Sequence, residues 1–210
     1  MNQLPRQMLL ACVLLFALTA QADSLSDAKR AYYTGDYAKA AKLFVPLAER
    51  GDASAQQTLG VMYNMGQGVP QDHKEAARWL RLAAEQGDAS AQFNLAVMYD
   101  EGQGVPQDYK EAVKWYRLAA NQGDVWAQYN LGLIYELGQG IPQDFREAVR
   151  WYRLAANQGN ASAQYNFGLM HDLGQGVPQD HKEAVRWYRL AAEQGNSHAQ
   201  AKLRLYMAKA

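Results

Sequence analysis

A glycine-rich loop is the stretch of this sequence whose residues most resemble a site for chemistry. It reads GQGVPQD at residues 66–72, 102–108 and 174–180, and GQGIPQD at residues 138–144. Glycine-rich loops can cradle phosphate groups, but phosphate-binding loops continue with a lysine and a serine or threonine. Here an aspartate closes each copy, at the place where an anion would bind a helix start. The loop therefore predicts architecture, and we expect no cofactor.

Two other patterns could support catalysis, and neither is complete. Ser26-Asp27-Ala28-Lys29 has the Ser-x-x-Lys spacing of penicillin-reactive serine enzymes, but the sequence lacks the Lys-Thr-Gly and Ser-Asp-Asn companions. No two histidines fall at metal-ligand spacing on one predicted helix; they are His73, His171, His181 and His198. We therefore expect no catalytic residue and no metal site.

The dominant feature is a period of 36 residues, which divides the middle of the chain into four repeats. Apolar residues fall at helical spacing twice in each repeat, so each repeat is expected to be a pair of helices joined by the loop. The tryptophans at one position of the second helix are expected to pack in the core. The repeats span 51–86, 87–122, 123–158 and 159–194, and the tryptophans are Trp79, Trp115, Trp151 and Trp187.

The loop residues also predict where the helices begin and end. In each repeat a glutamate follows the loop aspartate by three residues, as Glu75 follows Asp72, which indicates a capping box at the start of the second helix. The loop glycines allow the left-handed backbone that ends a helix. Proline before the aspartate stops earlier helix growth. Asp88 and its equivalents are expected to cap the first helices.

The AxAQxNLGxMY pattern of the first helix, the GQGVPQD loop and the EAVxWYRxAAxQG pattern of the second resemble the Sel-1-like repeat family, which is related to tetratricopeptide repeats. This resemblance implies an all-α fold, an α-solenoid that coils as a right-handed superhelix of antiparallel helix-turn-helix repeats. Members of the family are chiefly adaptors that hold proteins or peptides in complexes, and many bacterial members are exported.

The two ends of the array depart from the repeat. Residues 23–50 have a short turn around Gly35 in place of the long loop, so we interpret them as an N-terminal capping helix pair resembling a tetratricopeptide repeat. Residues 195–210 supply only a first helix, with Lys202 and Arg204 at positions that differ from the other repeats. We interpret this segment as a C-terminal capping helix, because terminal repeats need a polar outer face.

Residues 1–22 have the pattern of a signal peptide. Arg6 precedes an apolar run from Met8 to Ala20, and small residues stand at Ala20 and Ala22. A retained anchor is less favoured, because about 20 apolar residues are needed to span a bilayer. Lipidation at Cys12 is also less favoured, because few apolar residues precede it. We expect export to the periplasm or secretion, with no integral membrane span after cleavage.

The residues that vary between repeats cluster on one face of the first helices, because their offsets of three, seven and ten share a helix face. Trp126 is the sharpest departure, since a serine occupies its place in the other repeats; local packing on Tyr129 is the alternative explanation. By resemblance to tetratricopeptide repeats, this face lines a concave groove with acidic residues on its rim. The predicted partner-binding residues are Phe93, Asn94, Asp100, Trp126, Tyr129, Asn130, Glu136, Tyr165, Asn166 and Asp172.

We therefore expect a non-catalytic, exported scaffold or adaptor that binds a protein or peptide partner through this groove. The net charge is zero, which excludes the basic surface that nucleic acid requires, and no small-molecule substrate is expected. The alternative is a penicillin-binding or β-lactamase-like hydrolase, as described for some cysteine-rich family members. Those members are held by disulfides, whereas this chain has a single cysteine.

Overall fold

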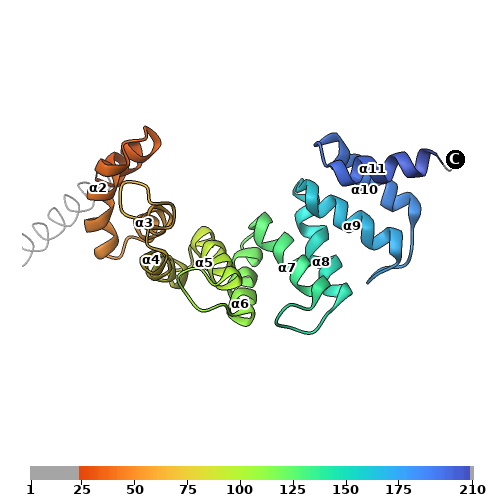
Figure 1. The fold of residues 1–210 in the computed structure, drawn as a ribbon, viewed down its shortest axis with the longest axis horizontal. Coiled ribbons are helices and arrows are strands. Elements are labelled where there is room, and N and C mark those ends of the chain that lie inside the picture. Colours follow the sequence, from red (N-terminus) through yellow and green to blue (C-terminus); the bar gives the residue numbers. More distant parts are fainter. Residues whose placement is uncertain (1–23, 209–210) are drawn as a thin grey trace, which may run out of the picture. The chain divides into compact units, whose positions relative to one another are not determined.

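The computed structural model describes residues 24–208, and all the regular secondary structure in this range is helical (Figure 1). The segment interpreted as a signal peptide lies outside the described residues. Residues 24–33 are helical, and ten further helices follow. Their bounds are α2 Tyr37–Glu49, α3 Ala53–Met65, α4 His73–Glu85, α5 Ala89–Glu101, α6 Tyr109–Asn121, α7 Val125–Leu137, α8 Phe145–Asn157, α9 Ala161–Leu173, α10 His181–Glu193 and α11 Ser197–Met207.

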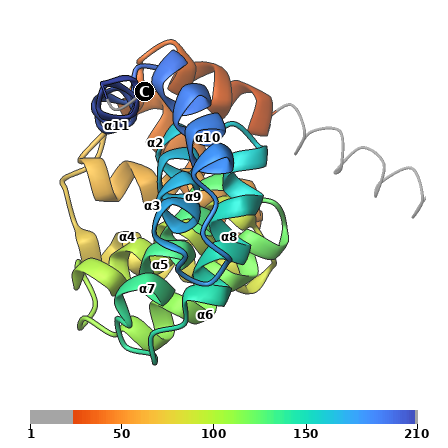
Figure 2. The same cartoon turned by 90° about the vertical axis from the view of Figure 1, so that its right-hand side faces the viewer.

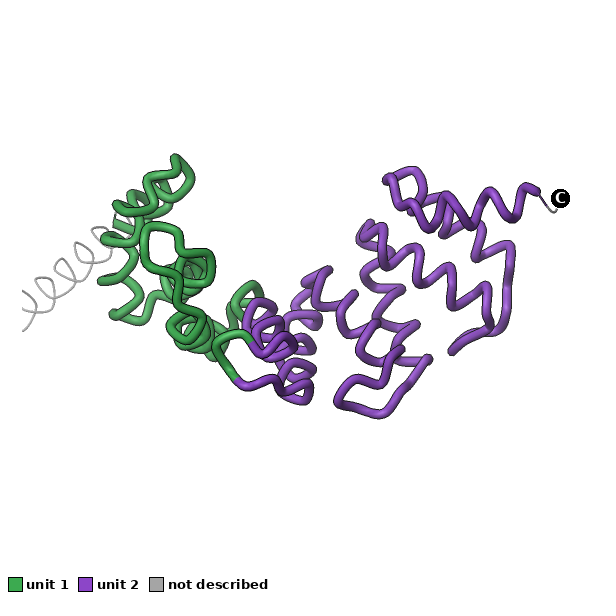
Figure 3. The backbone as a smooth tube through the Cα atoms, in the orientation of Figure 1, with its two compact units in different colours: residues 1–91, 103–105 green, residues 92–102, 106–210 purple. Residues whose placement is uncertain are grey.

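The chain forms two compact units (Figure 3). Unit 1 contains the described residues up to 91 together with 103–105, and unit 2 contains 92–102 and the residues from 106 onward. In unit 1, α3 packs against α2 and α4. In unit 2, α7 packs against α6 and α8, α9 packs against α8 and α10, and α11 packs against α10 (Figures 1 and 2). This packing between chain neighbours is the pattern of an α-solenoid, as predicted.

The start of the second helix confirms the predicted aspartate cap but not the predicted contact of the glutamate. The Asp72 carboxylate accepts hydrogen bonds from the backbone N–H groups of Lys74 and Glu75, at 2.9 and 3.1 Å. The glutamate does not reach back, however, because the Asp72 N–H already donates to the Tyr63 carbonyl at 3.0 Å. Glu75 pairs instead with Arg78 at 2.9 Å. Only the aspartate half of the predicted capping box is therefore present.

The remaining loop residues tie each loop to the helices around it. Gln71 Nε2 donates to the backbone carbonyl of Asn64 at 2.8 Å and so satisfies an exposed group at the end of α3. A Cβ on Gly68 would lie 2.2 Å from the Tyr37 carbonyl oxygen, closer than atoms can approach. The second glycine of the loop is therefore required because the backbone of the preceding helix pair lies against it.

The tryptophans form part of the core, as predicted, with exposed fractions between 2% for Trp151 and 7% for Trp187. Glutamines join consecutive repeats inside this core. Buried Gln128 donates to the Ala120 carbonyl of the preceding repeat at 3.1 Å and accepts from Gln158 at 2.8 Å. Because a buried amide is costly unless it is hydrogen-bonded, these bonds fix the register between neighbouring repeats.

Candidate functional site

The ten predicted partner-binding residues all lie on α5, α7 and α9 within unit 2. We call the side of these helices that carries them the first-helix face. Trp126 is its most exposed aromatic residue, with 57% of its surface accessible. Phe93, Tyr129 and Tyr165 are half-buried. The structure therefore places the variable residues on one set of helices, with different degrees of exposure.

The three half-buried aromatic residues each pack against a tyrosine of the second helix in the same repeat. The ring centroids lie 5.9, 6.1 and 5.7 Å apart in the pairs Phe93–Tyr116, Tyr129–Tyr152 and Tyr165–Tyr188. The partner tyrosines are fully buried. Each variable aromatic ring thus packs on a buried tyrosine of the core while part of its surface stays exposed.

Asp100 and Glu136 of the predicted acidic rim are half-buried and accept hydrogen bonds from tyrosines of the same repeats, and their contact with a partner stays a prediction. Asp100 Oδ2 accepts a hydrogen bond from the Tyr116 hydroxyl at 3.3 Å, and Glu136 Oε2 accepts one from Tyr152 at 2.5 Å. Burial raises the pKa of both tyrosines, and the adjacent carboxylates raise it further. The tyrosines therefore stay protonated and act as donors.

Asp172 is a buried structural carboxylate, so its assignment to a partner-binding rim is wrong. It is 9% exposed and accepts hydrogen bonds from Tyr188 at 3.1 Å, from Lys202 at 3.0 Å and from Tyr206. Tyr188 and Lys202 bind Oδ2, whereas Tyr206 binds Oδ1, and His181 Nδ1 also lies 3.0 Å from Oδ1. Burial alone would raise the pKa of Asp172, but the hydrogen bonds outweigh it and lower the pKa to about 2. Asp172 fastens α9 to α10 and α11.

The asparagines of the first-helix face lie near tyrosine hydroxyls. Burial raises the pKa of Tyr116, and a hydrogen bond with Asn130 opposes that rise. Asn166 has the same opposing effect on the pKa of Tyr129, which burial raises. These amides therefore link a first helix to its neighbours. Their use by the backbone of a bound peptide stays a prediction, as does that of Asn94.

Two exposed leucines on the first-helix face were not predicted from the sequence. Leu137, at the far end of α7 from Trp126, is 60% exposed, and Leu173, its equivalent on α9, is 53% exposed. Eleven residues make about three helical turns, so Trp126 and Leu137 lie on the same side of α7. The spacing of eleven residues from the Trp126 position and its equivalent could have identified both leucines from the sequence.

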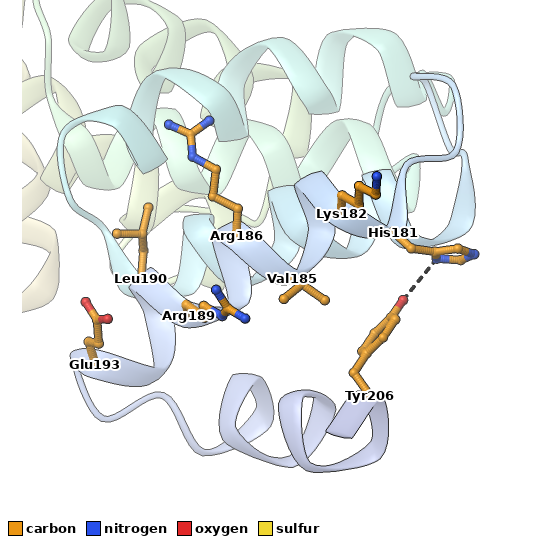
Figure 4. Close-up of a pocket in the computed structure, with 8 residues that line it drawn as sticks. All are labelled: His181, Lys182, Val185, Arg186, Arg189, Leu190, Glu193 and Tyr206. Carbon is orange, nitrogen blue, oxygen red and sulfur yellow. Dashed lines mark hydrogen bonds between the residues drawn. The ribbon is translucent and has the colours of Figure 1, made fainter. Parts of the chain in front are cut away.

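A separate open pocket of about 660 Å³ lies between α10 and α11 (Figure 4). A hydrogen bond of 3.0 Å between the Tyr206 hydroxyl and His181 Nδ1 closes one end of it. None of the ten predicted residues lines this pocket. The residues that line it are His181, Lys182, Val185, Arg186, Arg189, Leu190, Glu193 and Tyr206.

Residues 24–208 contain neither a cluster of metal-ligating side chains nor a membrane-spanning helix. Within them, no three histidine, cysteine, aspartate or glutamate side chains are grouped so that they could hold a metal ion. None of the helices in this range is long and apolar enough to cross a membrane. Ser26 of the Ser-x-x-Lys pattern is an exposed residue of the helical segment 24–33, next to an ion pair between Asp27 and Arg30.

Comparison with protein families identifies the repeat. The family model described as Sel1 repeat matches residues 53–88, 89–124, 127–160 and 161–196. The third match begins after Trp126, although the 36-residue period would start it two residues earlier. Val125 and Trp126 thus lie outside the matched residues of the third repeat. Comparison with curated proteins gave no match.

Solved structures show the same fold. The c5321 protein, a protective antigen of uropathogenic Escherichia coli with an SLR fold, is 38% identical over 89% of this chain, with a TM-score of 0.85. This chain covers 41% of that protein. A Sel1 repeat protein from Oxalobacter formigenes is 36% identical over 85% of this chain and 71% of its own, with a TM-score of 0.80. Helicobacter pylori cysteine rich protein B is 21% identical over 62% of this chain and 94% of its own, with a TM-score of 0.50, and shows the fold alone.

Sel1 repeats generally mediate protein–protein interactions, and proteins built from them are typically non-enzymatic scaffolds. The four matched repeats cover more than half of the sequence, and two solved Sel1 structures resemble it at more than 30% identity. The chain belongs to the Sel1 repeat family.

Proposed function

We propose that this protein is an exported, non-catalytic scaffold that binds a segment of another protein along the first-helix face. Trp126 carries the proposal, because a tryptophan with 57% of its surface in solvent gains little from folding. Tryptophan and tyrosine are the residues most enriched among binding hot spots. Leu137 extends the apolar surface along the same side of α7.

The chemistry of this face favours an apolar partner segment. Of its acidic side chains, Asp172 is paired with Lys202, whereas Asp100 and Glu136 accept hydrogen bonds from neutral tyrosine hydroxyls and keep their negative charge beside the apolar residues. Exposed Trp126, Leu137 and Leu173 offer anchor points for large apolar side chains. Asn130 and Asn166 add polar groups between them. A protein segment with spaced apolar residues is the partner class that fits.

Export is the second part of the proposal and rests on the sequence of residues 1–22, outside the described residues. The basic residue, the 13-residue apolar run and the Ala-Gln-Ala end are the observations behind it. The alternative of a hydrolase has no observation in its favour beyond the incomplete Ser26 pattern. We therefore propose no catalytic activity for this chain.

A photo-crosslinking experiment in the native cell envelope tests the proposal. A photo-reactive amino acid at position 126 should trap a partner, whereas one at Arg153, an exposed residue of α8, should not. Leu137→Ser should reduce capture from position 126. Leu205→Ser on α11, where the native side chain is 61% exposed, is the matched control and should leave capture unchanged.

Equal trapping at positions 126 and 153, or no effect of Leu137→Ser, would contradict binding on the first-helix face. The purified protein from the same preparation also reports on export. Its mass should correspond to a chain that begins at Asp23. A full-length mass would contradict cleavage of the signal peptide.

A further inference from the structure

The pocket between α10 and α11, which we call the end pocket, is an uncovered face of a second helix. Val149 and Ala156 of α8 are 9% and 2% exposed, whereas the equivalent Val185 and Ala192 of α10 are only half-buried. In unit 2, α8 is followed directly by a first helix, α9, and then by a further second helix, α10. Among the described residues, α11 alone follows α10. The end pocket therefore lies on one particular face of α10. On α6, an earlier second helix of unit 2, the second helix of the following repeat, α8, lies beside the equivalent face.

The interior of unit 2 shows what adjoins this face. A smaller pocket of about 340 Å³ is lined by Arg117 and Asn121 of α6 together with Glu147 and Trp151 of α8. Glu147 and Trp151 are four residues apart, so they lie on the same side of α8. Inside the array, the following second helix thus places an indole and a carboxylate in the same pocket as the arginine of the preceding one, with the Glu147 carboxylate paired to Arg150 of its own helix at 3.2 Å.

The end pocket contains the equivalent arginine, Arg189, but not the tyrosine hydroxyl that accepts a hydrogen bond from this arginine inside the array. Arg117 donates a hydrogen bond to the Tyr135 hydroxyl of the following first helix. Two repeats later the equivalent residues are Arg189 and Met207, and methionine supplies no comparable acceptor. No hydrogen bond or ion pair of the Arg189 side chain occurs within residues 24–208. Figure 4 shows Arg189 and Val185 on the side of α10 that faces α11.

The charge of the end pocket also selects its occupant. Lys182, Arg186 and Arg189 line it together with one carboxylate, that of Glu193. Arg186 is paired with Glu183 at 3.0 Å, so the positive charges that remain beside Glu193 are those of Lys182 and Arg189. Leu190, which is 37% exposed, and Val185 provide apolar surface between the charges. A helix with a carboxylate and an aromatic side chain on one side complements both features.

We propose that the end pocket binds an amphipathic helix of a second protein, with an aspartate or glutamate directed to Arg189 and an aromatic residue four positions away directed to Val185 and Leu190. A second copy of this chain does not offer such a helix among its described residues, because its own helices of this kind bury their tryptophans to 2–7% exposure. This site is independent of the first-helix face, since the two share no residue.

A peptide with the sequence of residues 144–158, blocked at both ends and fluorescently labelled, is the probe. It carries Glu147 and Trp151 in the arrangement that the interior uses. Isolated helices of this length are marginal in water, so a hydrocarbon-stapled form of the same peptide is measured in parallel. Fluorescence anisotropy against the purified protein should give saturable binding, tighter for the stapled form.

Charge reversal identifies the contact. Arg189→Glu should weaken binding by about tenfold or more, because it places like charges together. Arg153→Glu, the same position one repeat earlier, is the matched control and should leave the affinity unchanged. A peptide carrying Glu147→Lys should bind poorly to the unmodified protein and regain affinity for the Arg189→Glu protein.

Three results would overturn the proposal. The first is that the stapled peptide does not bind. The second is that Arg189→Glu and Arg153→Glu affect binding equally, or that the charge-swapped pair does not recover affinity. The third is sedimentation of the protein alone as a dimer that Arg189→Glu dissociates, which would assign the end pocket to a second copy.

Discussion

Repeats 3 and 4 share one scaffold and use the variable face of the first helix differently. In repeat 3, α7 exposes Trp126 and Leu137, and Glu136 accepts a hydrogen bond from one tyrosine, Tyr152. In repeat 4, α9 has a serine at the tryptophan position, and its variable carboxylate, Asp172, is buried among four partners. Both repeats expose the leucine at the end of the first helix, but only repeat 3 exposes a tryptophan, and only repeat 4 buries its variable carboxylate among several partners.

The cause of this difference lies in the following helix. The asparagine column that runs through Asn94, Asn130 and Asn166 continues as Lys202 on α11, which places an ammonium group 3.0 Å from Asp172. Tyr206 of the same helix adds a further hydroxyl donor. A variable carboxylate of a first helix is held inside the protein when the residue that faces it in the next repeat differs as well. This comparison makes specific predictions about stability.

Among the variants of the carboxylates and their tyrosine partners, the largest effect is expected from Asp172→Asn, which keeps the shape of the side chain and removes its charge. Hydrogen bonds to a charged group contribute about 1.5–3 kcal/mol each, so the variant should lose about 2–3 kcal/mol of local stability. The loss should appear as faster hydrogen exchange in α11 with little change in α7, because repeat arrays open locally. Asp100→Asn is the matched control and should lose less stability. Within unit 2, the Asp100 carboxylate accepts a hydrogen bond from one side chain only, that of Tyr116.

The same variant makes a prediction about pH. The pKa of Asp172 is lowered from 3.8 to about 2 in the folded chain, so the unfolded chain binds more protons between these values. Its contribution is therefore complete above the unfolded pKa and is lost as the pH falls through about 2. The stability difference between the unmodified protein and Asp172→Asn, from urea unfolding at several pH values, should shrink over this window. A difference that stays constant down to pH 2 would contradict the assignment.

A smaller effect is expected when a tyrosine hydroxyl is removed. Tyr152→Phe leaves Glu136 without the hydroxyl that it accepts from, whereas Tyr188→Phe leaves Asp172 with Lys202, Tyr206 and His181. Both variants keep a buried ring and create no cavity. We expect a loss of about 1–2 kcal/mol for Tyr152→Phe and roughly half of that for Tyr188→Phe. Equal losses in urea unfolding would show that the extra donors of Asp172 do not compensate one another.

The sequence predicted the scaffold well because its signals are local and repeated. The period, the apolar spacing and the residues at helix ends each recur four times, and the structure confirms the helix pairs, the aspartate caps and the buried tryptophans. The glutamate half of the capping box was wrong because a capping-box pattern does not reveal that the Asp72 N–H is already bonded to the Tyr63 carbonyl across the loop. Local patterns predict local structure, and contacts across a loop lie beyond them.

The candidate site was harder to predict because it depends on contacts between helices. Spacing correctly placed Phe93, Trp126 and Tyr165 on one set of helices, but it could not show that tyrosines of the second helices bind the acidic residues. Asp172 looks like a rim residue until Lys202 and Tyr206, at least 30 positions away, are brought to it. A variable position in a repeat is therefore evidence of a difference, and its partners decide whether that difference is functional.

The smallest effect on stability, and the sharpest test of that distinction, is expected at Trp126. If its indole serves a partner, Trp126→Ala should change the free energy of unfolding by less than about 0.5 kcal/mol, as exposed substitutions usually do. Trp151→Ala, at a site 2% exposed, should by contrast cost about 3–5 kcal/mol. Thermal unfolding of the two variants measures both values. A loss of more than about 1 kcal/mol at Trp126 would instead support the alternative that its indole packs on Tyr129, and would remove the main reason to place a binding surface on α7.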